Sequence, residues 1–231
     1  MAASIELALR GRNVVVTGAS GALGGAVVEV LAAAGARLHL PVRSKGARQP
    51  AGAEISVVEG VDLTDEASVT AFYTSCPPLW ASVHVAGGFA EAPLLSTSLA
   101  AFRGQLDMNL TTAFLCCREA ARNMTGRGGR LVNVGARSAQ APSGGSVGYT
   151  VAKAGVAAMT LALAAELASD AFGDGIRVNA ILPATIDTPA NRAAMPGADP
   201  ARWRKPAEIA LTIAWLISPA NTATSGGLIP V

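Results

Sequence analysis

The fold of this chain is indicated most strongly by the sequence Thr17-Gly18-Ala19-Ser20-Gly21-Ala22-Leu23-Gly24. It follows the apolar run Asn13 to Val16 and opens the helical pattern Ala22 to Ala34. Glycines in such a turn let the backbone approach a pyrophosphate, and the helix N-terminus directs free N–H groups and a positive dipole end at the anion. A glycine-rich turn between a strand and a helix therefore predicts a dinucleotide-binding site, with a plain tight turn as the alternative.

Apolar runs alternate with helical patterns on both sides of this turn. The runs are continuously apolar, as expected of parallel strands that are covered on both faces. The alternation predicts an α/β fold, a single-domain Rossmann-type doubly wound parallel sheet of about seven strands with helices on both faces, over residues 1–231. The expected strands are Asn13 to Val16, Arg37 to Val42, Ile55 to Val58, Trp80 to Val85, Arg130 to Val134, Ile176 to Ile181 and Leu228 to Val231. The expected helices are Ala22 to Ala34, Glu66 to Thr74, Ala101 to Met124, Tyr149 to Ala168 and Pro206 to Ile217.

Two segments interrupt the alternation. Gln140 to Gly148 is rich in glycine, serine and proline and is expected to be a loop, and Pro183 to Pro206 contains five prolines. In an open α/β sheet, ligands bind beyond the carboxyl ends of the strands, where both segments emerge. The two segments are therefore predicted to form the walls of a substrate site.

Composition excludes several classes of partner. The chain has 18 Lys and Arg residues against 16 Asp and Glu, a net charge of +2 without a basic stripe, which argues against nucleic acid. No uninterrupted apolar run reaches the roughly 18 residues of a spanning helix, and the N-terminus lacks a signal pattern, so no membrane partner is expected. The three cysteines have no metal-ligand spacing, so no metal is expected and a reducing cytoplasm suits them.

The residues after the second strand indicate the cofactor. Many NAD enzymes carry an acidic residue there for the adenosine ribose hydroxyls. Here the position holds Val42, followed by Arg43, Ser44 and Lys45. A carboxylate would repel a 2′-phosphate, whereas arginine can bind one bidentately. NADP(H) is therefore favoured over NAD(H), with solvated basic residues after a strand as the alternative.

The residues after the third strand are candidates for the adenine side of the cofactor. Asp62 and the adjacent Leu63 occupy this place. A second interpretation is equally good, because Asp62 or Thr64 could instead cap the N-terminus of the next helix.

Tyr149 and Lys153 are the candidate catalytic pair. Their spacing of four places both side chains on one helix face, one turn apart. An ammonium near a phenol is expected to lower the tyrosine pKa from about 10 towards working pH. Such a tyrosine can pass a proton to a carbonyl or imine while a nicotinamide supplies hydride.

With the glycine turn at this separation, the pair resembles the short-chain dehydrogenase/reductase family from about Arg10 to the end of the chain. Ala86-Gly87 is similar to the family's Asn-Asn-Ala-Gly element, although His84 and Val85 replace the asparagines. Asn109 matches the asparagine that in the family holds a water near the active lysine.

The resemblance also covers the segment that folds over the nicotinamide. Pro183 and Thr188 match it, with Ile186 placed to meet the carboxamide by its backbone. The expected catalytic residues are Tyr149, Lys153, Asn109 and Ser138. The expected cofactor-binding residues are Gly18, Ser20, Gly21, Leu23, Gly24, Arg43, Ser44, Asp62, Leu63, Ala86, Gly87, Tyr149, Lys153, Pro183, Ile186 and Thr188.

One position departs from the family pattern. The family has a serine thirteen residues before the tyrosine, which donates a hydrogen bond to the substrate oxygen, and here that position is Ala136. Ser138 would need a shifted loop to replace it. Losing such a donor costs about 10²–10³ in rate.

The departure resembles the dihydropteridine reductase branch, which keeps the tyrosine and lysine but has alanine in the serine position. Val85 to Phe89, Gly135 to Ala139, Leu182 to Pro196 and Ser225 to Val231 are similar to the same branch. The resemblance implies an NADP(H)-dependent reductase of a quinonoid dihydropterin-like small molecule. A carbonyl or 3-oxoacyl reductase is the alternative, and a weakly active NADP(H)-binding regulatory protein is a further one.

The chain is also expected to associate with itself. The helices Ala101 to Met124 and Tyr149 to Ala168 look apolar on more than one face. The resemblance implies a homodimer through these helices, or a homotetramer.

Overall fold

Seven parallel strands form one sheet in the computed structural model, which describes residues 7–44 and 54–231, so that Lys45 lies outside the described residues. The strand order is β3-β2-β1-β4-β5-β6-β7, and every neighbouring pair is parallel. The strands are β1 (Asn13–Thr17), β2 (Arg37–Val42), β3 (Ile55–Glu59), β4 (Ala81–His84), β5 (Gly129–Val134), β6 (Ile176–Leu182) and β7 (Leu228–Pro230). The expected doubly wound α/β fold and its strands are confirmed, with ends shifted by one residue at most.

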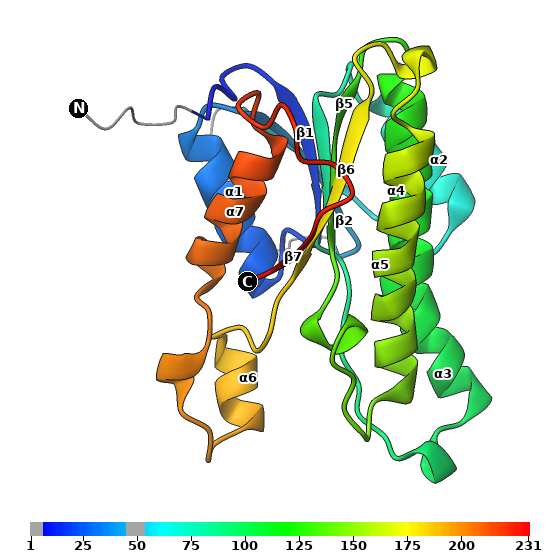
Figure 1. Cartoon of the computed structure of the whole chain (residues 1–231), viewed down its shortest axis with the longest axis vertical. Coiled ribbons are helices and arrows are strands. Elements are labelled where there is room, and N and C mark those ends of the chain that lie inside the picture. The colour runs from blue at the N-terminus through cyan, green and yellow to red at the C-terminus, as the bar shows by residue number, and fades with distance from the viewer. Residues whose placement is uncertain (1–6, 45–53) are drawn as a thin grey trace.

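Helices cover both faces of the sheet (Figure 1). One layer holds α1 (Ala22–Ala33) and α7 (Pro206–Ile217), which pack against each other. The other layer holds α2 (Glu66–Ser75), α4 (Thr112–Met124) and α5 (Val147–Glu166), with α3 (Leu99–Leu106) packed on α5. The short α6 (Pro189–Ala194) and α3 lie at the same end of the molecule (Figure 1).

Two apolar cores, one on each side of the sheet, hold these layers in place. Val14 and Val16 of β1 point into the core under α1 and α7, whereas Val15 between them belongs to the core under α2 and α4. This alternation follows from the two-residue period of a strand. Because both faces are buried, the strand can be apolar throughout, which is the pattern that the sequence shows.

The expected helix Ala101 to Met124 is interrupted. α3 ends at Leu106, a five-residue π-helical turn runs from Asp107 to Thr111, and α4 begins at Thr112. Within this turn Asn109 Nδ2 donates to the carbonyl oxygen of Gln105. Such π turns are frequent at functional sites, and periodicity alone did not reveal this one because the chain stays helical on either side.

Two loop expectations are corrected. The loop expected over Gln140 to Gly148 ends earlier, because α5 begins at Val147. The excursion from Pro183 to Pro206 contains α6, whose first residue is Pro189 and whose N-cap Thr188 accepts a hydrogen bond from the Asn191 N–H. Proline at the first helical position and threonine at the cap are favourable, so this helix had a readable signal.

Helix α5 is long and apolar enough, by length and composition, to cross a membrane. Its position in the fold gives another reason for this composition. It packs along β6 and against α3, and it holds Ala152 and Val156 in the interior. Part of its apolar character is therefore explained by the face that covers the sheet.

Candidate active site

The turn between β1 and α1 leaves no room for a side chain at two of its positions, Gly18 and Gly24. Gly18 has φ +69°, and a Cβ on it would lie 2.8 Å from the backbone nitrogen of Ala86. A Cβ on Gly24 would lie 2.0 Å from the carbonyl oxygen of Gly18. The Thr17 hydroxyl accepts a hydrogen bond from the Ala86 N–H at 3.1 Å, which joins the turn to the end of β4. Glycine is therefore required at positions 18 and 24.

The N-terminus of α1 is suited to an anion. Its N-cap is Gly21, which offers no side-chain hydrogen bond, and its first turn contains no acidic residue. Ser20 is exposed in the same turn, whereas Leu23 packs into the core. The free N–H groups and the helix dipole thus face outward without a competing carboxylate.

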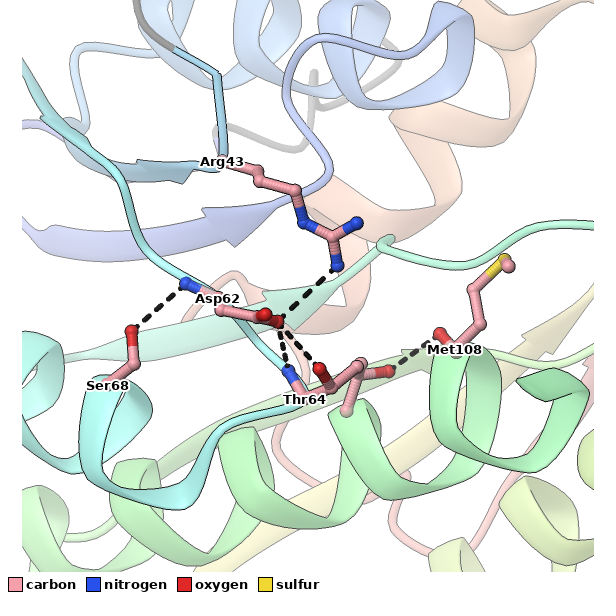
Figure 2. A network of polar contacts seen from close by, with 6 residues as sticks. Arg43, Asp62, Thr64, Ser68 and Met108 are labelled. Atoms are coloured by element: carbon pink, nitrogen blue, oxygen red, sulfur yellow. Dashed lines mark hydrogen bonds and ion pairs between the residues drawn. The ribbon is translucent and has the colours of Figure 1, made fainter. Parts of the chain in front are cut away.

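Arg43 follows the end of β2, and its side chain reaches Asp62 in the loop after β3 (Figure 2). Its guanidinium lies 3.4 Å from Asp62 Oδ1, and its side chain is 72% exposed. An ion pair of this length and exposure contributes about 0–1 kcal/mol, so Arg43 can leave it for a stronger anion. Ser44 is exposed next to it, and Leu63 packs partly against the core under α2 and α4.

Asp62 organises the turn before α2 but does not cap the helix. Its Oδ1 accepts hydrogen bonds from the Thr64 N–H and hydroxyl, which lower the pKa of Asp62 together with the charge of Arg43. Asp65 is the N-cap of α2 and accepts from the Ser68 N–H. The capping role considered for Asp62 or Thr64 is therefore wrong, because the chain makes one further turn before the helix begins.

Asn109 fastens the segment that follows β4. Its Nδ2 donates to the carbonyl oxygens of Gly88 at 2.9 Å and Gln105 at 3.1 Å, and its Oδ1 accepts from the Gly88 N–H at 3.2 Å. A Cβ on Gly87 would lie 2.6 Å from this Oδ1 and 3.4 Å from the amino nitrogen of Lys153. Gly87, Asn109 and Lys153 thus meet at one point. Both amide hydrogens of Asn109 are engaged with backbone.

Burial acts in opposite directions on the pKa values of Lys153 and Tyr149. Lys153 is 4% exposed, donates to the Val134 carbonyl oxygen at 2.8 Å, and has its pKa lowered to about 8 by burial. Burial raises the pKa of Tyr149 above its usual value. The lowering expected from sequence is therefore wrong for this arrangement, in which Lys153 Nζ lies 5.8 Å from the centre of the tyrosine ring. Desolvation penalises the phenolate more than the distant ammonium favours it.

A buried chain of hydrogen bonds runs over β4 and β5 on the face of the sheet that α2 and α5 cover. It runs from Tyr73 through Ser82 and His84 to Asn133, whose Nδ2 donates to Thr160 on α5. Burial lowers the pKa of His84 to about 4, so this side chain is neutral at physiological pH. Asn133 directly precedes Val134, whose carbonyl oxygen accepts the hydrogen bond from Lys153. The hydrogen bonds therefore anchor α5 to β5 next to the candidate pair Tyr149 and Lys153.

The structure places no second hydroxyl donor at Ala136, and the hydroxyl of Ser138, the candidate replacement, is inaccessible. Ala136 is 6% exposed and has no donor. Ser138 lies in the 3₁₀ turn Arg137–Ala139, where its Oγ is buried and has no hydrogen-bond partner among the described residues. Its hydroxyl would reach a substrate only if this turn moved.

The segment after β6 lies at the same end of the sheet. The Pro183 carbonyl oxygen accepts from the Arg137 N–H at 2.9 Å, and the Ile186 carbonyl oxygen accepts from Asn191 Nδ2 at 2.8 Å. Thr188 is engaged as the cap of α6. The bond between Arg137 and Pro183 ties the segment to the turn that contains Ser138, and the other two contacts hold the segment's own conformation.

Phe89 was not among the site residues expected from the sequence. Its ring packs on that of Tyr149 with the centroids 4.9 Å apart and the planes at 90°. Only its place after Gly87 and Gly88 could have drawn attention to it. Gln105 was also not expected, because its carbonyl oxygen, which accepts from Asn109, is a backbone group that any residue could supply.

The arrangement fits a nicotinamide dinucleotide. Three features offer places for the phosphates: the glycine turn at Gly18 and Gly24, the N-terminus of α1, and Arg43. Tyr149 and Lys153 lie near the start of α5. No cluster of three or more His, Cys, Asp and Glu residues able to hold a metal ion is found within 7–44 and 54–231.

Comparisons with known proteins agree with this geometry. A model of the family described as short chain dehydrogenase matches residues 12–198. The chain is 34% identical to cis-4-hydroxycyclohexanecarboxylate dehydrogenase of Sinomonas cyclohexanicum, covering 95% of this chain and 94% of that protein. It is 31% identical to the 3-oxoacyl-[acyl-carrier-protein] reductase MabA of Mycobacterium tuberculosis, covering 95% and 91%.

Solved structures are similar along nearly the whole chain. Aldohexose dehydrogenase of Thermoplasma acidophilum superposes with a TM-score of 0.83 at 26% identity, covering 96% of this chain and 93% of that one. A structure from Beutenbergia cavernae, described as a candidate NAD(P)-dependent gluconate 5-dehydrogenase with NADP bound at low occupancy, has a TM-score of 0.88 at 26% identity and covers 97% and 96%. With the glycine turn and the Tyr149–Lys153 pair in place, this chain belongs to the short-chain dehydrogenase/reductase family and is an oxidoreductase.

Proposed function

We propose that this enzyme reduces a flat, electron-poor ring of the quinonoid dihydropterin type, using NADPH and Tyr149 as the proton donor. The observation that carries the proposal is the missing second donor. Ala136 has no hydroxyl, and the Ser138 Oγ is buried. A quinonoid ring accepts hydride readily and can manage with one proton donor, whereas a ketone gains more from two.

The protonation states support reduction. A tyrosine with a raised pKa stays protonated at neutral pH and so holds the proton that it must give. Lys153, with a pKa of about 8, is largely cationic at pH 7 and can stabilise the phenolate left after transfer. The bound nicotinamide supplies the hydride; Asn109 and the Val134 carbonyl hold Gly88 and Lys153 in place.

The preference for NADP(H) over NAD(H) rests on Arg43. No acidic side chain ends β2, and among residues 7–44 and 54–231 the exposed guanidinium has a long contact with Asp62. Charge-assisted bonds from arginine to phosphate are stronger than such a surface pair. The 2′-phosphate of NADPH would therefore replace Asp62 as the partner of Arg43.

A carbonyl or 3-oxoacyl reductase is the second candidate. Two relatives favour it by name, MabA at 31% identity and carbonyl reductase family member 4 of Danio rerio at 32% identity, which covers 89% of this chain and 91% of that protein. In this case Ser138 would have to replace the serine that Ala136 lacks. The 3₁₀ turn would need to expose its hydroxyl.

We also propose a homodimer, or a homotetramer, in a reducing cytoplasm. Phe114 on α4 and Val151 and Leu161 on α5 are 44–48% exposed on the outer layer of the sheet. Exposed apolar side chains on neighbouring helices are typical of an interface. The free thiols Cys76, Cys116 and Cys117 are compatible with a reducing compartment.

The test of the reaction is NADPH oxidation by the purified enzyme, followed by absorbance, with a quinonoid dihydropterin and with a 3-oxoacyl thioester. Turnover of the pterin that is lost in Tyr149→Phe is the expected result. Ala136→Ser serves as the matched variant, because a restored hydroxyl should raise the rate on the thioester by about 10²-fold and change the pterin rate little.

Other outcomes separate the alternatives. Turnover of the thioester alone would replace the pterin proposal with the carbonyl-reductase one. NADPH binding without turnover of either acceptor, in both the wild type and Tyr149→Phe, would favour the regulatory protein.

A further inference from the structure

Phe89 is an exposed aromatic residue in contact with the catalytic tyrosine. Its side chain is 61% exposed, yet its ring lies edge to face with that of Tyr149, with centroids 4.9 Å apart and planes at 90°. Edge-to-face aromatic pairs attract each other beyond the effect of the area that they bury. One part of the Phe89 ring therefore restrains Tyr149, and the rest is available to another molecule.

The backbone around Phe89 is held at both ends. On one side, Gly88 exchanges two hydrogen bonds with the Asn109 side chain. On the other side, the Ala92 N–H donates to the Gly145 carbonyl oxygen at 2.8 Å, and Ala92 forms a bridge with Ser146. Since Ser146 is the N-cap of α5, the segment is tied to the start of the helix that bears Tyr149. The exposed ring thus stands on fixed backbone.

The close approach of this segment to the π-helical turn also explains the glycine at position 87. A Cβ on Gly87 would meet the Asn109 Oδ1 at 2.6 Å, and this oxygen is held by its hydrogen bond to the Gly88 N–H. The same approach brings Phe89, two residues later, next to the phenol.

We propose that Phe89 positions the Tyr149 phenol and forms the wall on which a flat substrate ring stacks. A planar ring against this face would direct a ring heteroatom at the hydroxyl of Tyr149, which compensates for the donor missing at Ala136. Phe89 is thereby both a positioning and a specificity-determining residue. The inference deepens the proposed function, because it depends on a planar substrate.

The experiment measures binding and turnover separately. An oxidised pterin (2-amino-4-oxopteridine), which cannot be reduced in the same way as the quinonoid form, is titrated into the enzyme with saturating NADP⁺, and its fluorescence is followed. Phe89→Leu should weaken pterin binding about tenfold, and Phe89→Trp should restore it, because the tryptophan ring provides the same stacking face. Leu211→Ala on α7, another exposed apolar residue at 57% exposure, is the matched control.

Two further measurements exclude a merely structural role. The affinity for NADP⁺ should be unchanged in Phe89→Leu, and the midpoint of urea unfolding should fall only slightly, because one aromatic pair at the surface is lost. The chain has two tyrosines, so tyrosine-specific NMR labelling gives two sets of ring signals, of which that of Tyr149 disappears in Tyr149→Phe. In Phe89→Leu the Tyr149 signals should move as the ring current of Phe89 is lost, while those of buried Tyr73 stay in place.

The outcomes distinguish this proposal from the proposed reaction. Unchanged pterin affinity in Phe89→Leu, or no pterin binding by the wild type, would contradict the stacking role of Phe89, even if quinonoid dihydropterin is turned over. Pterin binding that depends on Phe89, without any turnover of the quinonoid form, would support the stacking role of Phe89 and contradict the proposed reduction of a quinonoid dihydropterin.

Discussion

At the residue scale, burial decides what the ionisable groups of the site can do. Lys153 is nearly inaccessible and Tyr149 is largely covered, so the charged form of each is disfavoured. The tyrosine therefore keeps its proton and the lysine has its pKa lowered to about 8. Arg43 is the opposite case, because its exposure leaves its charge free for a ligand.

Replacing Arg43 should change the choice of cofactor. We expect Arg43→Ala to raise KM for NADPH by about 10- to 100-fold, the equivalent of a lost charged hydrogen bond, and to leave KM for NADH nearly unchanged. Arg37→Ala is the matched control, because Arg37 lies at the start of the same strand and pairs with Glu54. Steady-state kinetics with both cofactors give the answer. Equal losses with NADPH and NADH would contradict a 2′-phosphate contact.

At the element scale, local sequence signals are strongest where the backbone itself is constrained. The β1–α1 turn was predicted from glycine spacing, and the close approach of Gly24 to the Gly18 carbonyl gives the physical reason. The π turn at Asp107 to Thr111 had no such signal, because it depends on Asn109 bonding to Gly88 across the fold.

Two adjacent glycines in α1 should respond oppositely to alanine. A Cβ on Gly24 would clash with the Gly18 backbone, whereas on Gly25 the nearest atom, the Ala19 carbonyl oxygen, is 3.8 Å away. We expect Gly24→Ala to lower the free energy of unfolding by about 1–3 kcal/mol and to weaken NADPH binding. Gly25→Ala should raise it by about 0.5–1 kcal/mol through helix propensity. Urea unfolding measures both, and equal effects would show that the turn is not tightly closed.

At the scale of the whole molecule, the outer layer of α4 and α5 is more apolar than one chain needs. The interior face of α5 carries Ala152 and Val156, but Val151 and Leu161 on the same helix remain exposed. Some of the apolar side chains of α5 therefore lie in the core of the chain, and others lie on its surface.

A charge placed on this surface should separate the subunits. We expect the wild type to elute at a multiple of its 23.2 kDa chain mass in size exclusion with light scattering. Phe114→Glu should give a monomer, because a carboxylate in an apolar interface loses its hydration without a partner. Leu95→Glu, at a fully exposed residue of the 3₁₀ turn Leu94–Ser96, should leave the assembly intact. A wild-type monomer would contradict the proposed interface.

The strands and their order along the chain, the parallel sheet, the glycine turn and the placing of Tyr149 and Lys153 on one helix could all be predicted from the sequence. They follow from apolar periodicity and from residue spacing, which are local properties. Four features could not be predicted and came from the folded structure: the contact of Phe89 with Tyr149, that of Arg43 with Asp62, the buried hydroxyl of Ser138, and the direction of the Tyr149 pKa shift. Each of these depends on desolvation or on segments far apart along the chain, which packing brings together and no local pattern encodes.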